Sequence, residues 1–574
     1  MTQYESEGDL IHVDVNKNNL YVEKTEITRS LSSLAITVNS LDDILRKCGD
    51  FGRFQWIHYF FMNWIAMSFG IVSFYYIFGA AEPDHRCRLP EHIWPNDTQY
   101  NPMNSMHEMY INMYIPKSSS GQKWEKCVQY STDMINHTLE RCSNGWVYDR
   151  SIFGYTFTEE ANFVCENQAR KSWLAVVIQF SGFLVLVIGS LADKYGRKKL
   201  TVIISILLFI SCLITQIIMQ WIPMTIKTKF MILLLNQFAS GLSISNFSLV
   251  FILMFELTSS AHTSLAGNLA FISFTIGEVI VTLFAYLTRH WQHLKWANLL
   301  FLGVGIPYLY FIPESPLYLY AKGKYSKLES LLRQIANQNG RKENEWYSHY
   351  QDLLRNQPVI STHKHNVTFF RHTCRLVTYR AIILKLFITC LISLTTVMIY
   401  FQISYGLATM DVSPYLAILI GAVVEAISYI TSSLLLSTKL GRKGSFIILM
   451  SLTILSVFLI PIIEKYSSIA TVSMAQLGKY LISVTITITW IFIPELFPTS
   501  IRSTSNGCCI AFGRIGAILA PVIGTLIDKE YLSYTYYVSS ILGIIALLFS
   551  LFLPETKDKP MDDESDHSPD SNGI

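Results

Sequence analysis

The sequence is short of charge. Only 15% of its 574 residues are Asp, Glu, Lys or Arg, whereas soluble chains carry about 25%. The deficit comes from long uncharged runs such as 231–255, 445–463 and 537–553. Each run is near the roughly 20 residues that a helix needs to cross about 30 Å of hydrocarbon. The runs lack the alternation of barrel strands, so the sequence predicts an all-α membrane protein.

Several function classes have no motif in this chain. It contains no Gly-x-x-x-x-Gly-Lys-Ser/Thr loop for phosphate, no His-Glu-x-x-His and no cysteine–histidine spacing for zinc. We therefore expect no enzyme activity, no metal site and no cofactor. A basic stripe for nucleic acid is also missing. A carrier without an ATP site needs a gradient or an exchanged solute, so a counter-ion or exchanged solute is an expected partner.

Twelve hydrophobic segments are predicted. They lie at about 56–80, 172–192, 200–222, 229–255, 265–288, 296–312, 381–406, 413–436, 445–463, 468–492, 503–528 and 534–553. Residues 1–55 contain no apolar run of the kind that a cleavable signal peptide needs, and we expect a cytosolic tail there. Lys and Arg cluster in the loops 193–199, 438–444 and 313–380, which predicts that these loops are cytosolic. An even number of spans then places both termini in the cytosol.

The chain repeats three landmarks at nearly one offset. Gly196-Arg197-Lys198 after segment two returns as Gly441-Arg442-Lys443 after segment eight. Glu256 and Glu495 end segments four and ten, and Pro313-Glu314-Ser315 returns as Pro554-Glu555-Thr556. The repeat predicts two six-helix halves, 56–312 and 381–553, joined by a cytosolic linker 313–380 and followed by a cytosolic tail 554–574. Two such halves are the architecture of a major facilitator transporter.

A long polar segment, 82–170, separates the first two hydrophobic segments. It holds Cys87, Cys127, Cys142 and Cys165, and sequons at Asn96 and Asn136. Together these features predict an oxidised, glycosylated extracellular loop, although sequons also occur by chance. Four cysteines allow three connectivities.

Eight motifs resemble one transporter family. They are LDDIL (41–45), PDHRC (83–87), NGWVYD (144–149), NFVC (162–165), DKYGRK (193–198), PESP (313–316), ELFPT (495–499) and LPET (553–556). In this order and spacing they resemble the organic cation, organic anion and carnitine transporter family, solute carrier family 22, over about residues 41–557. The cysteine loop with PESP and ELFPT is specific to that family. The chain departs from it in having four loop cysteines where six are common, and Leu317 where an Arg usually follows PESP.

The resemblance implies a plasma-membrane transporter of organic ions. It also implies the disulfides Cys87–Cys142 and Cys127–Cys165.

Charges inside a membrane are costly and usually functional, and we select four of those in the predicted membrane segments as candidates. They are Glu278 in segment five, Glu425 in segment eight, Lys479 in segment ten and Arg514 in segment eleven. Arg514 can bind a carboxylate through two parallel hydrogen bonds, and its neighbours Gly513 and Gly516 are expected to leave space for a ligand. The competing interpretation makes Arg514 a structural partner for a glutamate.

The family resemblance bears on each of these charges. Position 514 is basic in the family's anion and carnitine transporters and acidic in its cation transporters. Glu425 resembles a glutamate of many cation and carnitine carriers, and either holds a substrate ammonium or neutralises Arg514. Glu278 has no family counterpart, and we expect it to face the cavity or to lie near the membrane surface. Lys479 is typical of the whole family, and we expect its amine to reach the surface from the outer end of its helix.

Aromatic side chains supply the rest of a pocket for organic ions, through stacking and cation–π contacts. Tyr400 and Phe401 in segment seven resemble a paired aromatic site of the family, and Phe247 and Phe274 match positions that are often aromatic there. The chain has 34 Phe and 31 Tyr, so packing or lipid contact is the competing interpretation for each ring. The predicted substrate site consists of these four rings with Arg514, Glu425 and Glu278.

A second group of charges lies at the cytosolic helix ends. It consists of Asp193, Arg197, Glu256, Glu314, Arg442, Glu495 and Arg502. Such charges can pair across the two halves when the inner side is closed and separate when it opens, so we interpret them as a gate. The competing interpretation is that each is a solvated anchor.

These features predict a secondary active or facilitative transporter of small organic ions that works by alternating access. Both signs of charge near the midplane favour a zwitterionic substrate, carnitine-like or amino-acid-like, or an anionic one. An organic cation transporter is the alternative within this class. A receptor or interaction protein built on a transporter fold is the alternative from another class. The expected partners are the substrate ion and the lipid bilayer, without nucleic acid.

Overall fold

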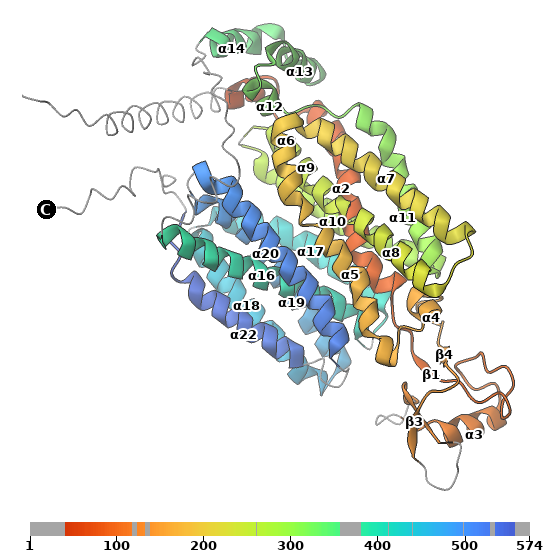
Figure 1. Ribbon diagram of the computed structural model, residues 1–574. Coiled ribbons are helices and arrows are strands. Elements are labelled where there is room, and N and C mark those ends of the chain that lie inside the picture. The colour runs from red at the N-terminus through yellow and green to blue at the C-terminus, as the bar shows by residue number, and fades with distance from the viewer. Residues whose placement is uncertain are drawn as a thin grey trace, which may run out of the picture. The chain divides into compact units, whose positions relative to one another are not determined.

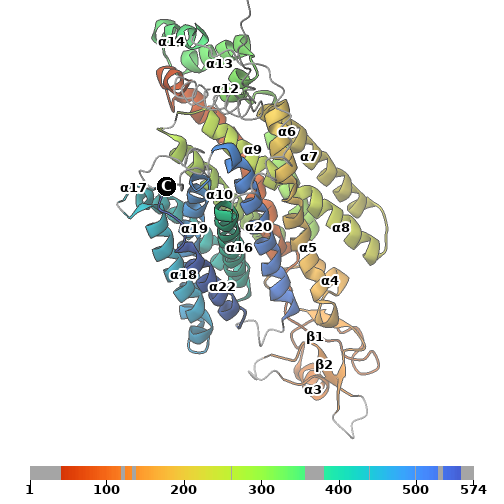
Figure 2. The same cartoon turned by 60° about the vertical axis from the view of Figure 1, so that its left-hand side comes forward.

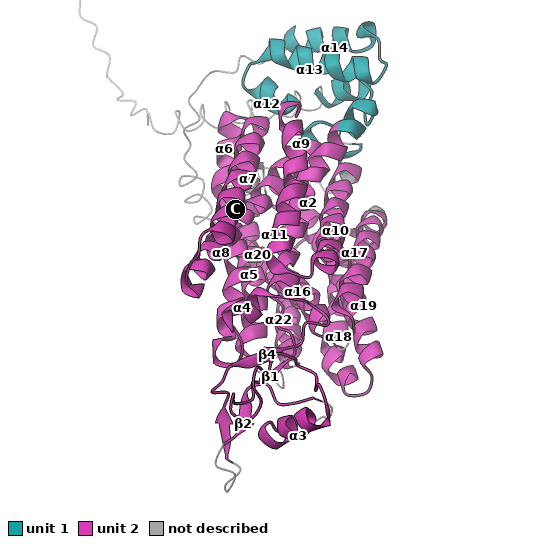
Figure 3. Cartoon of the chain, turned by 90° about the vertical axis from the view of Figure 1, so that its right-hand side faces the viewer, with its two compact units in different colours: residues 1–57, 255–263, 315–365 teal, residues 58–254, 264–314, 366–574 magenta. Residues whose placement is uncertain are grey.

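The computed structural model describes residues 41–117, 123–131, 138–259, 261–355, 380–410, 412–438, 440–497, 499–527 and 534–556. Most of the predicted N-terminal tail, part of the linker and most of the C-terminal tail lie outside these residues. The chain divides into two compact units (Figure 3). Unit 1 comprises 1–57, 255–263 and 315–365, and unit 2 comprises 58–254, 264–314 and 366–574. The bounds of the two six-helix halves and of the linker stay a prediction.

The membrane part is helical. Its helices are α2 (Arg53–Gly79), α5 (Ala169–Ser181), α6 (Leu184–Tyr195), α7 (Arg197–Trp221), α8 (Ile226–Ser240), α9 (Leu242–Glu256), α10 (Thr263–Thr288), α11 (Trp291–Gly305), α16 (Arg380–Gly406), α17 (Pro414–Ser437), α18 (Gly441–Glu464), α19 (Ser468–Glu495), α20 (Thr499–Leu526) and α22 (Tyr534–Ser550). In the described part of the chain, ten spans are long and apolar enough to cross a membrane.

The twelve predicted segments all coincide with helices, with two differences. Segments two and four, predicted as single helices, are each built from two, α5 with α6 and α8 with α9. Segments six and twelve are short: α11 passes into the 3-10 helix η2 (Ile306–Tyr310), and α22 has 17 residues. Unit 1 adds three linker helices: α12 (Pro316–Ala321), α13 (Tyr325–Gln338) and α14 (Glu343–Arg355).

The outward faces of the membrane helices are apolar. On α7 the exposed residues include Ile203, Ile206, Ile210, Ile214 and Ile217, whose spacing places them on one face. The buried face of α7 carries polar side chains such as Ser205 and Gln216. This distribution is typical of a helix whose outer face meets lipid and whose inner face packs in a bundle.

Within unit 2, the helices form two groups. Figures 1 and 2 show α2 and α5–α11 gathered on one side and α16–α22 on the other. Helix α20 packs along α16 in its own group and against α5 in the other. Residues on α5 and α20 therefore meet at the boundary between the groups.

The described residues between 82 and 170 form a small folded layer. Strand β1 (His85–Cys87) pairs antiparallel with β4 (Trp146–Tyr148), and β2 (Val128–Tyr130) pairs antiparallel with β3 (Leu139–Arg141). The layer also contains α3 (Ser105–Tyr114), α4 (Phe157–Ala161) and the 3-10 helix η1 (Cys165–Asn167). These short sheets are the addition to an otherwise all-α fold.

Two ion-pair clusters stabilise this layer. The buried Arg86 guanidinium donates to both carboxylate oxygens of Asp97, at 2.6 and 2.7 Å. Asp84 accepts from Lys123 and Lys126. Burial opposes ionisation of Asp84, but these two amines outweigh it and hold the pKa of the carboxyl at about 2. The Asp84 contacts thus contribute stability above a pH of about 4, the unfolded pKa, and lose it as the pH falls toward 2.

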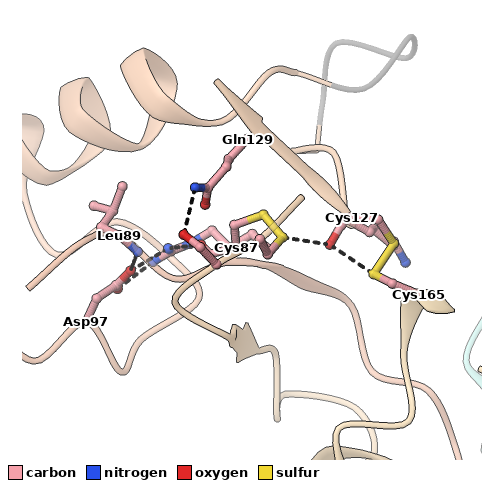
Figure 4. Close-up of a disulfide and its surroundings, with 10 residues drawn as sticks. Cys87, Leu89, Asp97, Cys127, Gln129 and Cys165 are labelled. Carbon is pink, nitrogen blue, oxygen red and sulfur yellow. Dashed lines mark hydrogen bonds and ion pairs between the residues drawn. A yellow bond between two sulfur atoms is a disulfide. The ribbon is translucent and has the colours of Figure 1, made fainter. Parts of the chain in front are cut away.

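The cysteines of the layer form two disulfides. Cys87 is joined to Cys142 and Cys127 to Cys165 (Figure 4). These are the pairs that the family resemblance implies. The side chain of Asn96 is exposed on the same layer, whereas Asn136 lies outside the described residues. Glycosylation at both sites stays a prediction.

Peptide mapping of the non-reduced protein is expected to recover the peptides joined through Cys87–Cys142 and Cys127–Cys165. The Cys127→Ser variant should expose one new thiol, at Cys165, to a maleimide label and leave the other bond intact. Loss of a native disulfide from a small extracellular layer costs about 2–5 kcal/mol, so lower surface yield should accompany the label. Free thiols at all four positions would contradict the pairing.

Candidate functional site

Three buried charges meet among α10, α17 and α19, and we call Glu278, Glu425 and Lys479 the acid–lysine cluster. The Lys479 Nζ lies 2.6 Å from the Glu278 Oε1 and 3.3 Å from the Glu425 Oε2. All three side chains have 0% exposure. The single ammonium of Lys479 therefore contacts two carboxylates, and none of the three side chains is exposed to solvent.

Hydroxyl groups complete the surroundings of Glu425. The Tyr400 hydroxyl on α16 donates to its two oxygens, at 2.9 and 3.1 Å. Tyr429, one turn further along α17, also donates to Glu425. The Glu278 Oε2, in contrast, is buried and has no hydrogen-bond partner among the described residues. Glu425 is thus fully engaged, and Glu278 keeps one free acceptor.

Close packing of α2 on α10 fixes the position of Glu278. A β-carbon added at Gly277 would lie 2.3 Å from the Met67 carbonyl oxygen, and one added at Gly70 would lie 2.2 Å from that of Phe274. Only glycine allows this backbone approach. The contact also brings Phe74 of α2 to the cluster, with its ring centroid 5.4 Å from the Lys479 Nζ.

Arg514 lies apart from these carboxylates, where α20 meets α5. Its Nη1 donates to the Gln179 Oε1 at 3.4 Å, and its Cζ lies 5.5 Å from the centre of the Phe69 ring. Within the described residues Arg514 forms no ion pair. Glu425 is bound to Lys479, so the interpretation of Glu425 as the partner that neutralises Arg514 is wrong.

The glycines beside Arg514 serve helix packing. A β-carbon at Gly516 would lie 2.2 Å from the Leu394 carbonyl oxygen of α16, and one at Gly513 would lie 3.0 Å from the Ser393 Oγ. Both glycines therefore face α16. The prediction that they leave space for a ligand is wrong, because periodicity alone did not show which face of the segment meets a neighbouring helix.

Two of the predicted aromatic residues gather beside Arg514. The Phe69 ring centroid lies 5.4 Å from that of Phe247 and 4.8 Å from that of Phe274. Phe274 in turn lies 6.0 Å from Phe74, the ring that covers Lys479. Rings of α2, α9 and α10 thus connect Arg514 with the acid–lysine cluster.

The other predicted pair belongs to the opposite helix group. Tyr400 and Phe401 are both buried, with ring centroids 5.2 Å apart, and Phe401 also packs against Tyr405 at 5.5 Å. The Tyr400 hydroxyl is engaged with Glu425. Tyr400 therefore contacts the acid–lysine cluster, whereas Phe401 packs beside Tyr400.

Sequence reasoning missed part of the site. Lys479, expected to reach the surface from the outer end of its helix, is fully buried in the cluster, so that expectation is wrong. Glu278 is equally buried and pairs with Lys479, while its depth in the membrane stays a prediction. Tyr429, Phe69 and Gln179 were not singled out. A tyrosine four residues after Glu425 was a usable signal, since i and i+4 share a helix face.

The predicted gate residues make contacts at helix ends. Glu314 accepts from the backbone N–H of Lys198 at 3.0 Å, and Asp193 pairs with Arg197 at 3.2 Å. Arg442 pairs with Glu495 at 3.3 Å. Both ion pairs join residues of one helix group, and pairing across the groups stays a prediction. Glu256 ends α9 in unit 1, and the Arg502 side chain lies outside the described residues.

The sequence has clear relatives. The family model for sugar (and other) transporters matches residues 117–565. Solute carrier family 22 member 6-A of Xenopus laevis is 27% identical over 551 residues, which cover 91% of this chain and 93% of that protein. Organic anion transporter 3 of Oryctolagus cuniculus is 28% identical over 549 residues, 91% and 92% of the two chains. Solute carrier family 22 member 4 of Mus musculus is 26% identical over 545 residues, 90% and 92%.

The fold also has solved counterparts. The xylose transporter XylE from E. coli, in a partially occluded inward open conformation, superposes with a TM-score of 0.56. The match covers 88% of this chain and 99% of that one, at 13% sequence identity. At 13% identity, this similarity is evidence for the fold alone. It confirms the predicted class, a twelve-helix membrane protein in two six-helix halves.

Proposed function

This chain belongs to the sugar (and other) transporter family, and we propose that it carries small organic anions across the plasma membrane by alternating access. Its relatives in solute carrier family 22 confirm the resemblance that the motifs indicated. It is an organic ion transporter of the major facilitator superfamily. The sign of the substrate's charge is the proposed part, since the names of the relatives do not fix it for this chain.

The observation that carries this proposal is Arg514. Its guanidinium lies between helix groups, against the Phe69 ring, without a carboxylate partner in the described part of the chain. The Arg514 side chain is half-buried. Removing a cation from water without a counter-ion is costly, and a substrate carboxylate would supply the missing charge. The rings of Phe69, Phe247 and Phe274 offer an apolar surface for the organic body of such a substrate.

A zwitterion is the second candidate, on a separate observation. The acid–lysine cluster has one more carboxylate than ammonium, and the aromatic rings connect it with Arg514. A substrate with a carboxylate at Arg514 and an ammonium directed toward the cluster would match both charges. A simple cation would match the cluster alone and would leave Arg514 without a carboxylate partner.

Uptake by purified protein in liposomes tests the proposal. The probes are hippurate, an aromatic carboxylate, L-carnitine, a zwitterion, and tetraethylammonium, a permanent cation. We expect uptake of hippurate, or of L-carnitine, above that of protein-free liposomes, and none of tetraethylammonium. Uptake of tetraethylammonium alone would reverse the assignment of charge. Specific binding of a probe without uptake would favour the receptor alternative.

We also propose that both termini are cytosolic. The disulfide-bonded layer with its exposed Asn96 supports an extracellular position for residues 82–170. An even number of spans then returns both ends to the other side. Endoglycosidase treatment should shift the electrophoretic mobility of the wild type, and Asn96→Gln should remove part of that shift.

The gate makes a further prediction. Asp193→Asn removes the ion pair with Arg197 at 3.2 Å and leaves the candidate substrate site unchanged. An i,i+4 ion pair with an exposed carboxylate contributes about 0.3–0.5 kcal/mol, so we expect the maximal uptake rate to fall about twofold with little change in the half-saturating concentration. Initial rates over a range of substrate concentrations measure both. A weakened affinity at an unchanged maximal rate would show that Asp193 is not a gate residue.

A further inference from the structure

We propose that the acid–lysine cluster binds one proton in each transport cycle, and that this proton releases the contact between the two helix groups. The proposal rests on the chain being a transporter, but not on the charge of its substrate.

The first step is the charge of the cluster. Glu278, Glu425 and Lys479 are fully buried, and together they carry one uncompensated negative charge when both acids are ionised. Leaving such a charge in a dry site costs several kcal/mol or more. A bound cation removes that cost.

Within the part of the chain that the structure describes, the surroundings of Glu278 supply no other charge. Helix α16 contributes the neutral Tyr400 hydroxyl, and α17 contributes that of Tyr429 besides Glu425 itself. Helix α19 contributes Lys479 alone, and α2 contributes the Phe74 ring. Among the described residues, the charged groups that act on Glu278 are thus Lys479 and Glu425.

The second step is the identity of the cation. The Glu425 oxygens already accept from two tyrosine hydroxyls and face Lys479, which leaves the Glu278 Oε2 as the unpartnered carboxylate oxygen. Hard metal cations require several oxygen ligands. A proton needs only one acceptor oxygen, and the unpartnered Glu278 Oε2 supplies it. Because the unpartnered carboxylate oxygen belongs to Glu278, the proton is placed on Glu278.

The third step is the position of the pair. Glu278 lies on α10 in the first helix group, whereas Lys479 and Glu425 lie on α19 and α17 in the second. The Glu278–Lys479 ion pair therefore ties the two groups together. A proton taken from water on the open side and placed on the Glu278 Oε2 makes that acid neutral. Lys479 then still pairs with Glu425, which lies 3.3 Å away in the same helix group. The free energy needed to separate the two groups is therefore lower.

Infrared difference spectroscopy tests the proton without any substrate. Spectra of the purified wild type at low and high pH should differ by a carboxylic acid C=O band that shifts in D₂O. Glu278→Gln should remove that band, and Glu278→Asp should keep it at a shifted frequency. Glu464→Gln, the same change at an exposed helix end, should leave the band unchanged. A band that persists in Glu278→Gln would overturn the assignment of the proton.

Liposome uptake of hippurate or L-carnitine under an imposed pH gradient tests the coupling. Wild-type uptake should respond, with up to about tenfold accumulation per pH unit for one proton exchanged against or moved with one substrate molecule, since tenfold is 1.4 kcal/mol. Glu278→Gln should lose this response, and Glu464→Gln, the same change at an exposed helix end, should keep it. Wild-type uptake that responds to a gradient in neither direction would overturn the coupling. Absence of uptake with every probe would instead refute the proposed function, while the infrared band still decides proton binding.

Discussion

Arg514→Ala strongly reduces uptake of the anionic or zwitterionic probe, while the amount of protein at the cell surface stays normal. The side chain has no carboxylate partner among the described residues, so its removal leaves no buried acid without a counter-ion. The variant should therefore fold. A charge-assisted hydrogen bond contributes about 1.5–3 kcal/mol, and losing it should reduce apparent affinity by about ten- to a hundredfold or more. Uptake and surface biotinylation measure the two quantities in the same cells.

Two further variants separate charge from shape. Arg514→Lys keeps the charge but loses the planar guanidinium, so it should retain weak uptake. Arg514→Asp should move preference toward tetraethylammonium. If the wild type carries tetraethylammonium well and Arg514→Ala leaves that uptake unchanged, Arg514 is structural and the proposed substrate charge is wrong.

Lys479→Met produces little folded protein, which is the second large effect that we expect. Lys479 lies 2.6 Å from Glu278 and 3.3 Å from Glu425, and its loss leaves both buried acids without their ammonium. Breaking a buried pair by removing one partner costs about 3–5 kcal/mol. That is a large part of the 5–15 kcal/mol that stabilises a typical domain. Detergent-solubilised yield and melting temperature measure the effect.

A compensated variant distinguishes loss of charge balance from loss of packing. Combining Lys479→Met with Glu278→Gln and Glu425→Gln makes the cluster neutral at nearly constant volume, and most of the melting temperature should return. The triple variant should still fail to respond to a pH gradient. A Lys479→Met protein that melts like the wild type would show that the ion pairs do not stabilise the fold.

The sequence predicted the helices and the repeat well, because both depend on local composition. Charge-free runs near the thickness of a bilayer have few alternatives to a spanning helix. Their boundaries were less certain, and the breaks between α5 and α6 and between α8 and α9 escaped notice because the apolar runs continue through them.

The partners of the buried charges could not be predicted in the same way. Glu278 and Lys479 are separated by 201 residues, and their meeting depends on which faces of α10 and α19 turn toward each other. Sequence reasoning selected Arg514, Glu425 and Glu278 as a group because each is a charge in an apolar segment. The sequence left open whether Glu425 holds a substrate ammonium or neutralises Arg514, whereas the structure pairs Glu425 with Lys479. Rotation of each helix about its axis decides such a choice, and a single sequence carries little information about that rotation.

The helix-end contacts of Glu314 and Glu555 have a consequence for how such a protein arises. Glu555 accepts from the backbone N–H groups of Arg442 and Lys443, at 2.9 and 3.0 Å, as Glu314 does from Lys198. The lysine side chains then reach back to carbonyl oxygens, of Tyr310 in one case and Leu551 in the other.

Each set of contacts joins residues of one helix group only, and no residue of the other group takes part. A duplicated ancestral copy would carry such a set intact, before any interface between the copies had evolved. The same independence lets each group rotate as a rigid body, since no contact of this kind has to break when the groups move.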